Sequence, residues 1–407
     1  MPRPHLLLVG TGARPFREYL LESIAAEYRI HLFTAAEPNW EKRYLDDSTV
    51  LASLLDPAEL VAAARRLHAD DPLDGVLCWD EALVHATAAV TDALGLTGPS
   101  AEAVLNCRDK HRTRSALAAA GVAQPASALV PDVDAALAAA ERIGYPVVLK
   151  PRALAASLGV VLVRDAGALR AAFTLAADTT VPGAPEHDQR VLVEEFADGP
   201  EISVDSAIVR GTVRPFCLAH KELGYPPYFE EVGHRVAGDD PLLHDPAVCD
   251  VLQRAHAAVG FTDGMTHTEL RLTASGPKVI EINARIGGDL IPYLGLRATG
   301  VDPGLVAAAI ACGRLPATIG CRSGSAAVRF CYVAEETTVD EVVVDESGLV
   351  PAVDRIEVLA VPGRSYSPPP RGTAFGRIAL VTAVADTAAE CAAGVESGVR
   401  ALRVVAR

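Results

Sequence analysis

Two short segments bring together the side chains with the clearest chemical potential: residues 266–273 (THTELRLT) and 278–285 (KVIEINAR). Polar and apolar residues alternate in both, which predicts two strands joined by a tight turn at residues 274–276. We expect one apolar face, with Leu270, Leu272, Ile280 and Ile282, and one polar face, with His267, Glu269, Arg271, Glu281 and Asn283.

With a turn of that length, Glu269 lies opposite Glu281, with the side chains about 5 Å apart. Two carboxylates at this spacing repel each other unless a cation lies between them. Together with the amide oxygen of Asn283 they form a hard oxygen set that suits Mg²⁺, and Arg285 could stabilise a phosphoryl or acyl oxygen. The alternative is a solvated polar face on which the two acids pair with Arg271 and Lys278.

Two lysines precede this hairpin. Lys150 ends the apolar run 146–151, where an ammonium group calls for an anionic partner such as phosphate. The small-residue loop 153–159 follows and could bind phosphate through backbone N–H groups and Ser157. Lys110 lies in the first turn of a helix capped by Asp109, against the dipole preference, which an anion there would explain. Alternatively, Lys150 is a solvated edge charge and Lys110 an exposed lysine beside Asp109.

The segment 191–201 (VLVEEFADGPE) places two acids, an aromatic residue and a turn between two strands. It could form a hinge that offers backbone groups to an adenine edge and a carboxylate to a ribose. Acids at a turn otherwise usually face solvent.

The composition describes an ordinary soluble protein. The chain has 407 residues, a net charge of −15 without a charged tail, and eight cysteines without a C-x-x-C pair. We therefore expect two or three domains, a cytoplasmic location with reduced thiols, and no nucleic-acid groove. The first apolar run, residues 6–9, is too short for a membrane span or a signal, so we expect no membrane partner.

The first hundred residues alternate short apolar runs with amphipathic stretches, which predicts a parallel sheet. Gly10 and Gly12 follow the first strand, but Pro15 replaces the third glycine of a dinucleotide-binding motif, so an NAD-linked oxidoreductase has little support. A second domain begins near residue 106, and residues 191–196, 201–209 and 213–220 are predicted as a three-stranded meander. A polar loop, residues 182–189, precedes them. A separate, strand-rich block from about residue 320 carries no recognisable catalytic group.

The order of these motifs resembles the ATP-grasp superfamily, most closely over residues 106–316. The resemblance implies an α/β protein with an ATP-grasp fold, in which two α+β subdomains grip ATP. The implied domains are residues 1–105 (parallel sheet), 106–316 (ATP-grasp, with a lid at about 106–189 and a larger part at about 190–316) and 317–407 (small and strand-rich).

The resemblance also assigns roles to individual residues. ATP would contact Lys110, Lys150, Ser157, Glu194, Glu195, Phe196, Ala197 and Glu201. The Mg²⁺ ligands, which could also hold Mn²⁺, would be Glu269, Glu281 and Asn283. Arg285 and His234 would be catalytic, and the substrate contacts would be His267, Gly287, Gly288 and Glu81. His234 could instead be a structural histidine.

Residues 229–234, 266–269 and 283–289 are most similar to the L-amino acid ligases, which implies a small-molecule carboxylate and an amine as substrates. The alternatives are a purine-pathway or carboxylase-type ATP-grasp enzyme, or a nucleotide-binding module without turnover. One departure from the family is the phosphate loop, which has Ala153, Ala155 and Ala156 where relatives are glycine-rich. The last block could serve in packing, in closing the substrate pocket, or as the contact of a homodimer.

Overall fold

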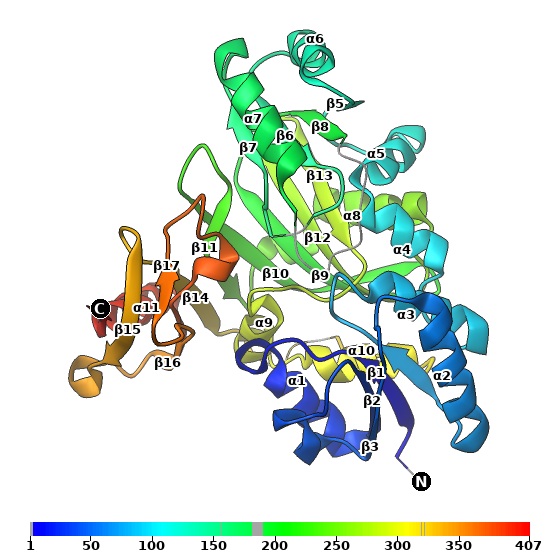
Figure 1. Cartoon of the computed structure of the whole chain (residues 1–407). Coiled ribbons are helices and arrows are strands. Elements are labelled where there is room, and N and C mark those ends of the chain that lie inside the picture. Colours follow the sequence, from blue (N-terminus) through cyan, green and yellow to red (C-terminus); the bar gives the residue numbers. More distant parts are fainter. Residues whose placement is uncertain (1–2, 155, 181–189, 319, 321) are drawn as a thin grey trace.

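The computed structural model describes residues 3–154, 156–180, 190–318, 320 and 322–407. Its N-terminal part is a parallel sheet of strand order β3-β2-β1-β4 (Figure 1). Alternate side chains of β1 enter different cores: Leu6 and Leu8 pack towards α1 and α10, whereas Leu7 and Val9 pack towards α2 and α3. This burial on both faces is typical of parallel strands and confirms the predicted sheet. The elements are β1 (His5–Val9), α1 (Arg14–Glu27), β2 (Arg29–Thr34), η1 (Trp40–Tyr44), β3 (Asp47–Val50), α2 (Pro57–Asp70), β4 (Gly75–Leu77) and α3 (Val84–Leu94).

A small antiparallel sheet forms the lid, in the order β5-β8-β6-β7, with α6 and α7 packed on it. Strand β8 belongs to this sheet, so the predicted three-stranded meander is wrong: only β9 and β10 pair with each other. The predicted loop at residues 182–189 lies outside the described residues. The elements are α4 (Ala101–Arg108), α5 (Lys110–Ala119), β5 (Ser127–Val130), α6 (Val133–Ile143), β6 (Val147–Pro151), β7 (Val161–Val163), α7 (Ala166–Asp178) and β8 (Val191–Glu195).

The central sheet has eight strands in the order β13-β12-β9-β10-β11-β14-β18-β16. Its first five strands come from the middle of the chain and carry the predicted hairpin. The elements of this region are β9 (Glu201–Val209), β10 (Thr212–Gly224), β11 (Glu230–Ala237), η2 (Pro241–His244), α8 (Pro246–Val259), β12 (Gly264–Thr273), β13 (Gly276–Asn283), α9 (Ile291–Thr299) and α10 (Pro303–Ala311).

The last ninety residues extend this sheet, although their sequence suggests a separate block. Strands β14, β18 and β16 continue it, whereas β17, β15 and β19 form a three-stranded sheet beside it (Figure 1). Backbone pairing of β11 with β14 joins the two regions. The elements are β14 (Ser325–Cys331), β15 (Thr337–Val344), η3 (Glu346–Gly348), β16 (Val353–Val358), β17 (Arg364–Tyr366), η4 (Ala374–Gly376), β18 (Ala379–Ala385), α11 (Ala388–Arg400) and β19 (Leu402–Ala406).

The β12–β13 hairpin differs in detail from the predicted one. Thr273 pairs with Gly276, so the turn is one residue shorter, and a bulge after Glu269 restores the pairing of Glu269 with Glu281. Because of the bulge, Val279 is buried in the core and Ile280 lines a pocket. Placing Ile280 on the apolar face was therefore wrong, because period-two alternation does not hold across a bulge.

Within the described residues, no single helix is long and apolar enough to cross a membrane. Helices α9 and α10 pass such a test only as a pair bent by 104°. Both lie largely in the core beneath the N-terminal and central sheets.

Candidate active site

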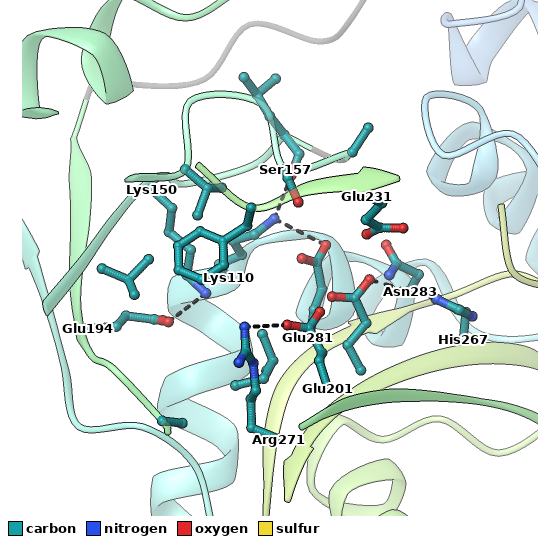
Figure 2. Close-up of a pocket in the computed structure, with 18 of the residues that line it drawn as sticks. Lys110, Lys150, Ser157, Glu194, Glu201, Glu231, His267, Arg271, Glu281 and Asn283 are labelled. Carbon is teal, nitrogen blue, oxygen red and sulfur yellow. Dashed lines mark hydrogen bonds and ion pairs between the residues drawn. The ribbon is translucent and has the colours of Figure 1, made fainter. Parts of the chain in front are cut away.

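A pocket of about 180 Å³ lies between the lid and the central sheet (Figure 2). It brings together most of the residues singled out from the sequence, which come from the first residue of α5, from β6, β8, β9, β12 and β13, and from the loops beside these strands. Those that line it are Lys110, Lys150, Ser157, Glu194, Glu195, Phe196, Ala197, Glu201, His267, Glu269, Glu281, Asn283, Arg285 and Gly288. His234, Gly287 and Glu81 are not among the lining residues.

A buried charge cluster lies at the lid end of the pocket. The Lys150 ammonium is 2.5 Å from Glu194 Oε2, and the Arg114 Nε is 2.7 Å from Glu194 Oε1. Both partners of Glu194 are more than nine-tenths buried. Lys150 is thus no solvated edge charge, and burial lowers its pKa in spite of Glu194. The sequence analysis missed Arg114, although it lies one helical turn after Lys110.

We expect this cluster to make stability depend on acid pH. Burial opposes ionisation of Glu194, but the charges of Arg114 and Lys150 outweigh it and hold its pKa at about 2, against 4.5 for an ordinary glutamate. A carboxyl with a depressed folded-state pKa stabilises the fold above the unfolded pKa and loses that contribution as pH falls through the folded one. Between pH 5.5 and 3, the free energy of unfolding should fall by roughly 2 kcal/mol more in the wild type than in Glu194→Gln.

Denaturant titrations at several pH values would measure this difference. The overall loss of stability in Glu194→Gln is not informative, because the substitution leaves Arg114 and Lys150 buried without their acidic partner. Only the slope with pH matters, and parallel slopes would contradict the assignment.

The carboxylates of the hairpin are held by two lysines. Glu269 Oε1 lies 2.9 Å from the Lys221 Nζ, and Glu281 Oε1 lies 3.1 Å from the Lys110 Nζ. Arg271 and Lys278 pair instead with Glu201, at 2.7 Å, and Glu195, at 2.6 Å. The alternative pairing of Arg271 and Lys278 with the two hairpin acids is therefore wrong.

Lys221 was also missed by the sequence analysis. Only 1% of its side chain is exposed, and its Nζ contacts Glu201 at 3.0 Å, Glu231 at 2.7 Å and Glu269. Burial alone would lower its pKa, but the acids, Glu231 foremost, raise it well above the ordinary value. The three carboxylates that converge on Lys221 therefore stabilise a positive charge in this part of the pocket. With the Asn283 amide beside them, Glu269 and Glu281 therefore fit a Mg²⁺ ion.

Leu154, Ala156 and Ser157, from the loop predicted to bind phosphate, line the pocket on the lid side. Lys110 also donates to the backbone oxygen of Leu154 at 2.6 Å, and Asp109 caps the helix as predicted while pairing with Arg152. Ala156 and Ser157 have left-handed backbones, with φ of 56° and 53°. Ala155 lies outside the described residues. Lys110 is thus buried and in contact with both the loop and Glu281.

Arg285 extends from the end of β13 towards the N-terminal sheet. Its Nε lies 2.8 Å from Glu81 Oε2, and Glu81 also faces Arg108 Nε at 3.5 Å. Glu81 does not line the pocket. Its ion pair orients the guanidinium of Arg285, which does line the pocket.

Gly287 acts through its backbone. Its N–H donates to Asp205 Oδ2 at 3.4 Å, and its carbonyl accepts from the partly buried Arg17 of α1 at 3.1 Å. The other oxygen of Asp205 lies 2.7 Å from His267 Nδ1. These contacts fix the ring of His267, whose Nε2 lies 3.8 Å from Glu269.

Gly287→Ala is expected to disturb this arrangement. An added Cβ would lie 2.9 Å from His267 Nδ1 and 3.1 Å from Asp205 Oδ1. Because neither group can move freely in a packed interior, we expect the free energy of unfolding to fall by about 1–3 kcal/mol. Gly288→Ala is the matched control, since a Cβ there meets nothing within 4 Å. Equal denaturation midpoints for the two variants would contradict the expectation.

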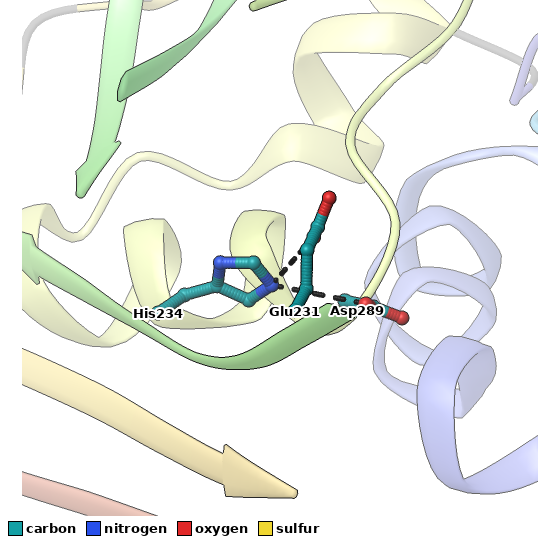
Figure 3. Close-up of side chains that lie close together, drawn as sticks. All are labelled: Glu231, His234 and Asp289. Atoms are coloured by element: carbon teal, nitrogen blue, oxygen red, sulfur yellow. Dashed lines mark ion pairs between the residues drawn. The ribbon is translucent and has the colours of Figure 1, made fainter. Parts of the chain in front are cut away.

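His234 is completely buried, and Figure 3 shows its ring beside Glu231 and Asp289. Its Nε2 lies 3.2 Å from Glu231 Oε2 and 3.8 Å from Asp289 Oδ2. Burial lowers its pKa, but Asp289 and Glu231 outweigh burial and raise it. The three side chains are close enough to share a metal ion, and the two carboxylates also pair with Lys221 and Arg377. His234 is thus linked to the pocket through Glu231 and Asp289, which do line it.

Residues 143–293 match the family model of the ATP-grasp domain. The uncharacterized protein y4rH of Sinorhizobium fredii is 31% identical over 337 residues, which cover 81% of this chain and 67% of that protein. The alanine–anticapsin ligase of Bacillus subtilis is 28% identical over 244 residues, 54% of this chain and 50% of the ligase, so the chain spans about half of that relative. The crystal structure of an L-amino acid ligase from Bacillus licheniformis has the same fold over the full length of both chains, with a TM-score of 0.81 and 22% identity.

Proposed function

The chain belongs to the ATP-grasp superfamily and has its fold, and from this premise we propose that it is an ATP-dependent ligase that joins a carboxylate to an amine through an acyl phosphate. We further propose that an amino acid is one of its substrates. The domain bounds would be those given from the sequence, with β8 added to the lid and β14, β16 and β18 sharing the central sheet. The predicted site residues that line the pocket would have the roles given above, whereas His234, Gly287 and Glu81 would act through the residues that they contact. The observation that carries the proposal is that one pocket contains two buried lysines, Lys110 and Lys150, together with the carboxylates of Glu269 and Glu281 and the guanidinium of Arg285.

Lys110 and Lys150 would bind ATP phosphates. Both line the pocket, and each pairs with a carboxylate, Glu281 and Glu194 respectively, whose place a phosphate group could take. Both oxygens of Glu194 are engaged, so its contact with adenine would come from the backbone, as would that of Ala197. Glu195, Phe196 and Ser157 would contact the nucleotide, and Glu201 the ribose.

Glu269, Glu281 and Asn283 would hold Mg²⁺, which when bound neutralises phosphate charge. Lys221 and Lys110 would then give up or share their carboxylate partners. Both lysines keep negative partners in that exchange: Lys221 retains Glu201 and Glu231, and Lys110 gains phosphate.

The reaction would proceed in two displacements. A substrate carboxylate oxygen attacks the γ-phosphorus and ADP leaves; the amine nitrogen then attacks the acyl carbon, phosphate leaves, and the amine loses a proton. Arg285 would stabilise the oxyanion of the second step, oriented by Glu81. His267 would be held facing the substrate by Asp205.

The carboxylates of Glu231 and Asp289 support an amino acid as substrate. Their oxygens already have partners, but a carboxylate oxygen has two lone pairs and can accept a further hydrogen bond. Both carboxylates line the same end of the pocket and would accept hydrogen bonds from the ammonium group of the amino acid. The alanine–anticapsin ligase of Bacillus subtilis suggests alanine as the first probe.

The test is to measure ADP and phosphate release with Mg-ATP over all pairs of the standard amino acids, and to determine product masses. We expect release that depends on both members of a pair, with a product mass equal to their sum minus water. Release that depends on bicarbonate or on a ribonucleotide amine would support the carboxylase or purine alternative. Nucleotide binding without release under any condition would support a module without turnover.

A further inference from the structure

Arg377, from the last block of the chain, is engaged at the substrate end of the pocket without lining it. Its two terminal nitrogens lie 2.7 and 2.8 Å from the two oxygens of Asp289, and one of them also donates to the backbone oxygen of Glu231 at 3.2 Å. Its Nε donates to the Tyr332 hydroxyl at 3.0 Å. The guanidinium lies 3.6 Å from the centre of the Phe330 ring. Only 4% of this side chain is exposed.

The backbone that Arg377 holds is unusual. Asp289 and Leu290 are consecutive non-glycine residues with left-handed φ of 50° and 65°. Such residues persist only where surrounding contacts determine them, and they concentrate at functional sites. Leu290 is buried, and packing holds it in place. The Asp289 side chain is 26% exposed and lines the pocket, so packing holds it less, and the bidentate pair with Arg377 keeps it in position.

Arg377 also fixes the second acid at this end of the pocket. It binds the backbone at Glu231, and the Glu231 side chain lies between Lys221 and His234. Arg377 therefore contacts both acidic residues at this end of the pocket, Asp289 through its side chain and Glu231 through its backbone. A guanidinium suits this task because it forms several hydrogen bonds in one plane and stacks on an aromatic ring.

We propose that Arg377 is a positioning residue for the carboxylate-donating amino acid: it holds Asp289 and Glu231 at the places where the ammonium group of that substrate binds. This inference rests on the proposed function. It gives the last block of the chain a part in substrate binding, beyond packing and pocket closure.

Arg377→Met tests the inference, because methionine keeps much of the apolar volume on Phe330 but loses every hydrogen bond. With L-alanine, or the amino acid with the highest rate in the pair screen, we expect KM for that substrate to rise about 30-fold, while kcat falls less than threefold and the Kd of a nonhydrolysable ATP analogue changes less than twofold. Arg377→Lys keeps the charge but not the bidentate geometry, and should recover part of the affinity. Should the methionine variant fail to fold, Arg377→Lys and Asp289→Asn carry the test, each expected to raise KM about tenfold.

Arg297→Met is the matched control. Arg297 likewise joins the middle of the chain to the last block, from α9 to Asp354 of β16 at 2.6 Å, but it does not line or touch the pocket. The Arg297→Met variant should therefore leave the KM for the amino acid within twofold of the wild-type value.

Two results would overturn the inference: an equal rise in KM in the Arg377→Met and Arg297→Met variants, or equal losses of nucleotide and amino acid affinity in Arg377→Met. Failure of the proposed function would look different, since the wild type itself would then show no amino-acid-dependent ADP release.

Discussion

Glu281→Gln should lower kcat for ligation about 1,000-fold, the magnitude expected when an enzyme loses a group that balances charge in phosphoryl transfer. Glutamine has almost the same shape, so the pocket should keep its form. It removes the negative charge that faces both Lys110 and, in our proposal, Mg²⁺. Steady-state ADP release at saturating Mg²⁺ measures the effect, and a Mg²⁺ titration should show weakened metal dependence.

Glu222→Gln is the matched control for Glu281→Gln. Glu222 follows Lys221 on β10 and also carries ion pairs, with Arg235 at 3.1 Å and Arg329 at 2.9 Å, but it does not line the pocket. We expect its kcat to stay within twofold of the wild type. If Glu281→Gln retained more than a tenth of the activity with unchanged Mg²⁺ dependence, Glu281 would not be a metal ligand.

Arg285→Lys should lower kcat about 100- to 1,000-fold, because lysine retains the charge but cannot reproduce the directed hydrogen bonds to a developing oxyanion. The affinity for the ATP analogue should be nearly unchanged, since Arg285 pairs with Glu81 of the N-terminal part, whereas Lys150 and Glu194 pair with each other on the lid strands. Single-turnover experiments separate the steps: acyl phosphate formation, detected by trapping with hydroxylamine, should be less affected than amide formation.

Arg108→Lys controls for the loss of a partner of Glu81. Both arginines face Glu81, Arg285 at 2.8 Å and Arg108 at 3.5 Å, but only Arg285 lines the pocket. Arg108→Lys should therefore retain most of the activity. Equal losses in the two variants would mean that Arg285 acts through Glu81 and not on the substrate.

The hairpin illustrates both the reach and the limit of reasoning from sequence. Alternation along residues 266–273 and 278–285 predicted two strands, and the pairing of Glu269 with Glu281 is confirmed. Yet that pairing results from two departures that cancel, a shorter turn and a bulge. The bulge is set by the packing of Val279 in the core, which a local pattern does not contain, and it reverses the predicted orientation of Ile280.

Strand β8 shows the same limit at the level of topology. Its apolar residues predicted a strand correctly, but three strands in succession suggested a meander. In the structure β8 inserts between β5 and β6 of the lid, and only then does the chain enter the central sheet. Which sheet a strand joins depends on the contacts available to its edges, and the neighbours of β8 are distant in sequence.

The sequence by itself determined many of the elements, the parallel N-terminal sheet, the ATP-grasp resemblance and most of the pocket lining, because periodicity and short motifs act over a few residues. Only the tertiary structure decided which charges meet: Arg114 with Glu194, Lys221 with three acids, and Arg377 with Asp289. Buried ions require partners, but many acids and bases in the chain could satisfy that need. The choice among them is made by the packing of strands and helices that are far apart along the chain.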